Sequence, residues 1–198
     1  ALPIYHTSGG RLELGVGAAW NEDECNAYGI KLGSLTERFD RFAEGLEVIK
    51  LLLTQKQSSF KGRYYDLTDA YCEPKPVQSP MPPVLIGGGG FKRTLPLVAR
   101  YADHWNSPGN SEDPLGDLGK SLARLRECCD EVGRDMSQIR ISTQLWVAQM
   151  SDAQAVETAL AYADAGVGLG LVSLPRPLSP RDIHRYAELF GPVFGGGK

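Results

Sequence analysis

The stretch from Pro83 to Leu95, PVLIGGGGFKRTL, decides how the chain is organised. It opens with a short apolar run, breaks into four consecutive glycines and continues as a helical pattern. This order is typical of a strand that ends in a phosphate-binding turn at the start of a helix, where backbone N–H groups point toward the anion. We therefore expect this stretch to hold the phosphate of a cofactor.

The size and charge of the chain narrow its class. The 198 residues, 42% of them hydrophobic, are enough for one domain with a substantial core. No apolar run approaches the roughly 20 residues that cross a bilayer, so we expect no membrane partner. The net charge is −3, and the Lys and Arg residues are scattered among acids, so nucleic acid is not an expected partner either.

The cysteines and histidines form no recognisable disulfide or metal pattern. No two cysteines have the CxxC spacing, and two cysteines adjacent in sequence do not readily bridge to each other. Neither residue type has the spacing of metal ligands. We therefore expect reduced thiols, a cytoplasmic protein and no metal site. The residues concerned are Cys25, Cys72, Cys128, Cys129, His6, His104 and His184.

Apolar periodicity divides the chain into alternating strands and helices. The expected strands lie near residues 11–17, 84–87, 103–106, 139–149 and 169–173. The expected helices lie near residues 35–53, 91–101, 115–132, 151–165 and 180–190. Residues 60–67 are expected to form a small hairpin or an extended excursion. Strict alternation predicts an α/β fold with a parallel sheet, either a doubly wound sheet or part of a (β/α)8 barrel.

Ligands of such sheets bind at the carboxyl ends of the strands. The residues expected there are Asn21, Gly87 to Gly90, Asn106, Trp146 to Gln149 and Ser173 to Arg176. Two interpretations of Asn21 stay open from spacing alone. Its amide offers a donor and an acceptor to the edge of a heterocycle, or its side chain caps the next helix.

Seven short motifs, in this order, resemble one family. They are RLELGVGAAWNE (11–22), AYGI (27–30), ER (37–38), FKGRYY (60–65), EPKPVQ (73–78), IGGG (86–89) and ARYADHWN (99–106). Together they resemble the bacterial-luciferase-like flavin and deazaflavin oxidoreductases, and most of all the bacterial branch that uses coenzyme F420.

The resemblance implies a partial TIM (β/α)8 barrel over residues 1–194, followed by a flexible tail at 195–198. The strands of this chain correspond to barrel strands four to eight, so the first three strands are absent and the domain is expected to be incomplete at its N-terminus. A barrel without those strands has two open edges, near residues 11–17 and 168–174.

The resemblance also assigns roles to individual residues. Asn21 matches the position that touches the cofactor ring, and the turn Gly87, Gly88, Gly89, Gly90 with Thr94 matches the site that holds the cofactor phosphate. Lys92 and Arg93, expected in the first turn of the following helix, either add charge there or face solvent. The triplet His104, Trp105 and Asn106 lies near the expected substrate entrance, and a core Trp with a turn Asn is the alternative interpretation. No Ser/His/Asp or Cys/His constellation is present, so no catalytic acid or base is named.

The function implied by the resemblance is hydride transfer between coenzyme F420 and an unknown small organic substrate. One alternative keeps the fold with FMN as the cofactor of a monooxygenase. Another is a non-catalytic cofactor-binding protein or remnant, because the wall built by the first three strands is absent. The resemblance is compatible with a homodimer, and no residue pattern requires one.

Overall fold

The computed structural model describes residues 2–174, 176–177 and 179–194. The expected tail at residues 195–198 lies outside them. The contacts divide the chain into two compact units, residues 1–85 and residues 86–198, which are described separately below. That these units form the single domain expected above stays a prediction.

Five parallel strands form the main sheet, which confirms the expected α/β fold class. The strand order is β1 (Leu14–Val16), β4 (Val84–Gly87), β5 (His104–Ser107), β6 (Arg140–Trp146) and β7 (Leu169–Ser173). Strands β5 and β6 are paired in parallel with Asn106 opposite Ser142, and β6 pairs in parallel with β7. Each expected strand is present, although β1 is shorter than residues 11–17 and β6 is shorter than residues 139–149.

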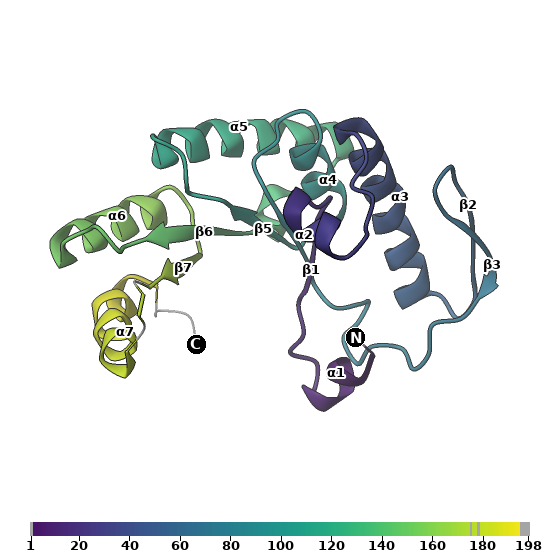
Figure 1. Ribbon diagram of the computed structural model, residues 1–198, viewed down its shortest axis with the longest axis horizontal. Coiled ribbons are helices and arrows are strands. Elements are labelled where there is room, and N and C mark those ends of the chain that lie inside the picture. Colours follow the sequence, from purple (N-terminus) through teal and green to yellow (C-terminus); the bar gives the residue numbers. More distant parts are fainter. Residues whose placement is uncertain (1, 175, 178, 195–198) are drawn as a thin grey trace. The chain divides into compact units, whose positions relative to one another are not determined.

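The first unit is built on a long helix and a hairpin. It contains α1 (Leu2–Thr7), α2 (Glu22–Ala27), α3 (Leu35–Thr54), β2 (Ser58–Lys61) and β3 (Asp66–Ala70). Strands β2 and β3 pair in antiparallel fashion and lie beside α3 (Figure 1), which confirms the expected hairpin. Helix α3 begins with a complete capping box between Ser34 and Glu37. The two short helices α1 and α2 were not expected from apolar periodicity.

One carboxylate of α3 fixes the turn of this hairpin. Glu44 Oε1 accepts a hydrogen bond from the amide of Arg63 at 3.0 Å. Its Oε2 accepts from the amides of Tyr64 at 2.8 Å and Tyr65 at 3.3 Å. These bonds favour the ionised carboxylate, and they lower the pKa of Glu44 from its usual value of 4.5.

The second unit carries the remaining helices on its strands. They are α4 (Thr94–Tyr101), α5 (Pro114–Val132), the 3-10 turn η1 (Met136–Gln138), α6 (Asp152–Asp164) and α7 (Pro180–Phe194). Helices α5 and α6 run along one side of β5 and β6 (Figure 1). Helix α5 ends at Gly133, whose φ of 69° is left-handed, and α6 begins with a capping box between Ser151 and Gln154.

Two helix boundaries of this unit differ from expectation. Helix α4 begins at Thr94 and not near Phe91, because Arg93 has non-helical backbone angles (φ −129°, ψ −46°). Lys92 and Arg93 therefore precede the helix. Helix α7 continues past Gly191 to Phe194 with Pro192 inside it. A glycine costs only about 1 kcal/mol in a helix interior, which is not enough to end the helix by itself.

Strand β6 has two chemically different faces. Ile141, Thr143 and Leu145 are buried, and the buried Tyr162 of α6 forms a hydrogen bond with Thr143, so this face lies against the helices. Ser142, Gln144 and Trp146 lie on the opposite face because side chains alternate along a strand. No helix of the described residues combines the length and apolarity that a membrane crossing requires.

Candidate functional site

Gly88 is held on both sides by strand β5. Its amide donates a hydrogen bond to the carbonyl of Asn106 at 3.1 Å, and its own carbonyl accepts one from Trp105 Nε1 at 2.8 Å. The φ of Gly88 is +109°, a conformation that side-chain-bearing L residues rarely adopt. The position of the glycine turn is therefore fixed from within the second unit.

Thr94 packs against the turn from the start of α4. Only 5% of the residue is exposed, and its amide donates to the carbonyl of Gly90 at 2.9 Å. A Cβ added to Gly90 would lie 2.8 Å from Thr94 Oγ1, closer than real Cβ contacts. This approach requires glycine at position 90 unless Thr94 moves.

The turn presents backbone N–H donors that have no acceptor among the described residues. Within the described residues, the amides of Gly89, Gly90 and Phe91 donate no backbone hydrogen bond. Successive N–H groups of this kind form an anion-binding concavity. The N-terminus of α4 follows three residues later and adds its positive dipole end.

A pocket of about 280 Å³ lies beside this turn and belongs wholly to the second unit. The residues that line it include Ser107 and Ser121, which carry hydroxyl groups, and Asp117, which carries a carboxylate. Asp117 bonds to Lys120 at 2.9 Å, and this bond, together with one from Ser111, lowers the pKa of the Asp117 carboxyl. The pocket therefore combines hydroxyls and backbone donors with one carboxylate. Its other lining residues are Gly89, Phe91, Pro108, Gly109, Asn110, Ser111 and Pro114.

A buried polar network lies on the face of β5 and β6 away from the helices. Ser142 Oγ is 2.7 Å from His104 Nε2 and accepts a hydrogen bond from Asn106 Nδ2 at 2.8 Å. Ser142 is fully buried and His104 is 2% exposed, whereas Asn106 is half-buried. The network joins residues that face each other across the β5–β6 pair.

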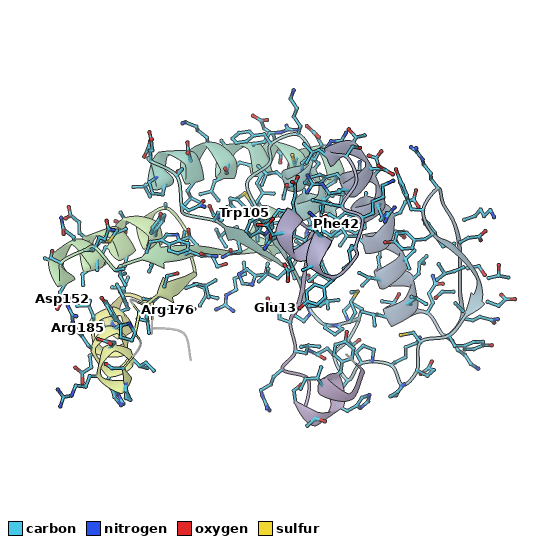
Figure 2. The ribbon with its side chains drawn as sticks, viewed as in Figure 1. Glu13, Phe42, Trp105, Asp152, Arg176 and Arg185 are labelled. Atoms are coloured by element: carbon cyan, nitrogen blue, oxygen red, sulfur yellow. The ribbon has the colours of Figure 1, made fainter. Side chains whose placement is uncertain are left out.

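The structure brings the glycine turn together with two of the three expected substrate residues. Asn106 and Trp105 both contact Gly88, the first through its backbone carbonyl and the second through its indole nitrogen. Trp105 (labelled in Figure 2) is completely buried. This burial agrees with the alternative interpretation, in which Trp105 is a core residue. The roles of His104, Trp105 and Asn106 toward a substrate stay predictions.

Asn21 belongs to the first unit and caps α2. Its Oδ1 accepts a hydrogen bond from the amide of Glu24 at 3.2 Å, which is the capping interpretation given above. The Nδ2 group is not used by this cap. Contact between Asn21 and a cofactor ring stays a prediction.

Sequence reasoning missed three serines of this region. Ser142 is a polar residue in the middle of the strand pattern ISTQLW, and Ser121 is a small polar residue among the apolar positions of α5. Ser107 directly follows the expected strand near 103–106. The sequence does mark such serines, because each is an uncharged polar residue at a position where the periodicity predicts a buried side chain. Among the described residues, no group of three or more His, Cys, Asp or Glu side chains is arranged to hold a metal ion.

A model of one protein family matches residues 2–189, nearly the whole chain, and its description is luciferase-like monooxygenase. The chain belongs to this family. Its relatives in this family include an F420-dependent protein and an FMNH2-dependent protein. Both cofactor types were implied by the resemblance in sequence.

Three curated relatives illustrate this range. An uncharacterised protein of Mycobacterium bovis is 32% identical over 132 residues, which are 67% of this chain and 44% of that protein. An F420-dependent glucose-6-phosphate dehydrogenase of Amycolatopsis mediterranei is 38% identical over 95 residues, 48% of this chain and 26% of that protein. An FMNH2-dependent dimethylsulfone monooxygenase of Pseudomonas putida is 32% identical over 112 residues, 57% of this chain and 31% of that protein. The chain thus spans less than half the length of these relatives.

The fold is similar to that of solved luciferase-like enzymes. The crystal structure of the monooxygenase RslO1 from Streptomyces bottropensis superposes with a TM-score of 0.72 at 20% identity. The superposition covers 96% of this chain and 70% of that chain. This likeness supports a partial barrel and concerns the fold alone.

Proposed function

We propose that this chain is part of an oxidoreductase that transfers a hydride between coenzyme F420 and a small organic substrate. The observation that carries the proposal is the glycine turn. Gly88 is held by Asn106 and Trp105, and a pocket of about 280 Å³ opens beside the turn. In the part of the chain that the structure describes, the next three amides donate to no backbone carbonyl.

The residues of this turn fit a phosphate group. The amides of Gly89 and Gly90 would donate to the phosphate oxygens, while Trp105 and Thr94 keep the turn in place. Ser121 offers a hydroxyl from the wall of the same pocket. The hydride chemistry itself would be supplied by the deazaflavin ring of the bound cofactor, and the chain orients that ring by fixing its phosphate.

Coenzyme F420 is the first candidate because a relative that is 38% identical over 95 residues is named as F420-dependent. FMN remains the second candidate, because a relative of this chain is named as FMNH2-dependent.

A titration of the purified chain with F420 and with FMN tests the proposal. We expect F420 to bind more tightly than FMN, as measured by the change in cofactor fluorescence. Gly89→Val adds a side chain whose Cβ would lie 3.9 Å from Ser121 Oγ, at a position whose φ is outside the left-handed region. We expect it to weaken F420 binding by at least about tenfold, which corresponds to ~1.4 kcal/mol.

The matched control is Gly119→Val, on the exposed surface of α5 with no atom within 4 Å of the added Cβ. It should bind F420 like the parent chain. Tight binding of FMN without binding of F420 would contradict the proposal and make FMN the cofactor. Binding of either cofactor with no turnover in the presence of any substrate would favour the non-catalytic alternative.

A further inference from the structure

The first unit contains a pocket of its own, with a volume of about 560 Å³. All its lining residues lie between Gly15 and Tyr65, so it belongs wholly to residues 1–85. It shares no lining residue with the pocket beside the glycine turn. Its walls are formed by the chain around the end of β1, by the segment after α2 and by α3. A volume of this size is typical of sites for small molecules.

Most side chains that line this pocket are apolar. Phe42, labelled in Figure 2, and Ile49 come from α3, and both are half-buried. Ile30 is 59% exposed although it is a large aliphatic side chain. The remaining large apolar contacts come from Val16 and Leu32. Apolar side chains around a concave surface favour a ligand with an apolar body, because its binding removes their surface from water.

The charged side chains of the lining are mainly cations. Lys31, Arg38 and Arg41 line the pocket, and within the described residues none of them forms an ion pair. The carboxylate of Glu37 also lines it and accepts a hydrogen bond from the amide of Ser34 at 3.4 Å. The lining therefore carries an excess of positive charge, which attracts an anion.

Arg38 is bonded through one nitrogen and lacks partners at the other two. Its Nη1 donates a hydrogen bond to the carbonyl of Ala19 at 2.9 Å. Nε is buried and has no partner among the described residues. Nη2 has no partner there either and is not among the buried atoms, so it is open to solvent. An anion at Nη2 would compensate the charge of this half-buried guanidinium group.

Both guanidinium groups are held in place by contacts within the unit. Ala19 has a φ of 61°, which residues with a side chain rarely adopt, and its carbonyl fixes Nη1 of Arg38. The guanidinium carbon of Arg41 lies 5.3 Å from the centre of the Tyr64 ring. Cations that are already positioned lose less conformational entropy when an anion binds.

We propose that this pocket binds a small organic carboxylate. Its apolar body would contact Phe42, Ile49 and Ile30, and its carboxylate would accept a hydrogen bond from Nη2 of Arg38. The proposal concerns residues of the first unit alone, so it does not depend on the cofactor site proposed above.

The first test measures which part of a ligand the pocket recognises. We use 2-naphthoate as the probe, its neutral analogue 2-naphthamide and inorganic phosphate, with binding to the purified chain measured by equilibrium dialysis. We expect saturable binding of 2-naphthoate, at least about fivefold tighter than that of 2-naphthamide because only the carboxylate pairs with the cations. Phosphate at the same concentration should not displace it, because phosphate has no apolar body.

The second test locates the binding with two opposite charges at one position. Ile30 is largely exposed, so neither Ile30→Glu nor Ile30→Lys should disturb the fold, as checked by circular dichroism. We expect Ile30→Glu to bind 2-naphthoate at least about fivefold more weakly than Ile30→Lys, because a carboxylate in the lining repels the probe. The matched control is Ile183→Glu, which makes the same change at a 50% exposed residue of α7 and should leave binding unchanged.

Three results would overturn the proposal. They are the absence of saturable 2-naphthoate binding, equal affinity for 2-naphthoate and 2-naphthamide, and equal binding by the Ile30→Glu and Ile30→Lys chains. Displacement of 2-naphthoate by phosphate would overturn the role of the apolar lining. Neither F420 nor FMN enters these measurements, so their outcome is distinguishable from a failure of cofactor binding.

Discussion

The indole nitrogen of Trp105 donates a hydrogen bond to the carbonyl of Gly88 at 2.8 Å, linking a fully buried strand residue to the glycine turn. The same glycine donates to the backbone of Asn106 at 3.1 Å. Two bonds from neighbouring residues of β5 therefore define where the turn lies. The core of the second unit and the proposed phosphate site share this tryptophan.

Replacing Trp105 with Phe keeps an aromatic ring in the core and removes the indole N–H. The carbonyl of Gly88 loses its partner, and we expect a loss of about 1–3 kcal/mol in the free energy of unfolding. Urea denaturation measures it. Trp20→Phe is the control, because Trp20 is 82% exposed and its substitution should change stability by less than about 0.5 kcal/mol. Equal effects of the two changes would show that the bond to Gly88 contributes nothing.

Gly88→Ala tests the backbone conformation of the turn. With φ at +109°, an alanine at this position is strained whatever space surrounds it. We expect destabilisation of about 1–3 kcal/mol in thermal or urea unfolding. Gly119→Ala, on the exposed face of α5, should instead be neutral or stabilising by up to about 1 kcal/mol. A Gly88→Ala chain as stable as the parent would mean that the turn adopts another conformation.

Glu44 makes the hairpin sensitive to acid. Its pKa is lowered in the folded chain by hydrogen bonds from the amides of Tyr64, Arg63 and Tyr65, opposed by partial desolvation. Because the folded pKa lies below the unfolded one, the stabilisation is fully present above the usual pKa of Glu, and it is lost as pH falls through the lowered value. Amide hydrogen exchange at residues 63–65 should therefore accelerate in acid.

Glu44→Gln should accelerate that exchange at neutral pH as well. Glu47→Gln is the matched control on the same helix, because the Glu47 carboxylate accepts no hydrogen bond in the described residues. If the Glu44→Gln chain kept full protection at residues 63–65, the three amides would not depend on the charge of the carboxylate.

The four cysteines, all free, should differ in reactivity. Burial raises the pKa of Cys128 and of Cys129, and a thiol reacts with alkylating reagents as the thiolate. Cys72 is only half-buried. In the native chain at neutral pH, iodoacetamide should label Cys72 well before the Cys128–Cys129 pair, as followed by mass spectrometry of peptides. In denaturant, the labelling rates of the cysteines should become similar. If Cys128 and Cys129 were labelled before Cys72 in the native chain, their burial would be contradicted.

Much of the fold could be predicted from local patterns. The run PVLIGGGG, the capping boxes at Ser34 and Ser151 and the stop at Gly133 each depend on residues within a few positions of one another. The parallel sheet followed from the alternation of strands and helices, and family membership of the chain followed from the order of its motifs. These features depend on residues that are close in sequence, so the amino-acid sequence is sufficient to predict them.

The contents of the candidate site were decided by tertiary structure. The bond between Trp105 and Gly88 joins residues 17 positions apart, and that between Asn106 and Ser142 joins residues 36 positions apart. Periodicity marks Ser142 only as a polar residue in a strand, and it gives neither its partner nor its burial. The sequence by itself determined that a glycine turn follows β4. The approach of β5 to the turn decided which residues hold it, and the pairing of β5 with β6 decided that Asn106 bonds to Ser142. Hydrogen bonds between strands depend on register in space and not on nearness in sequence.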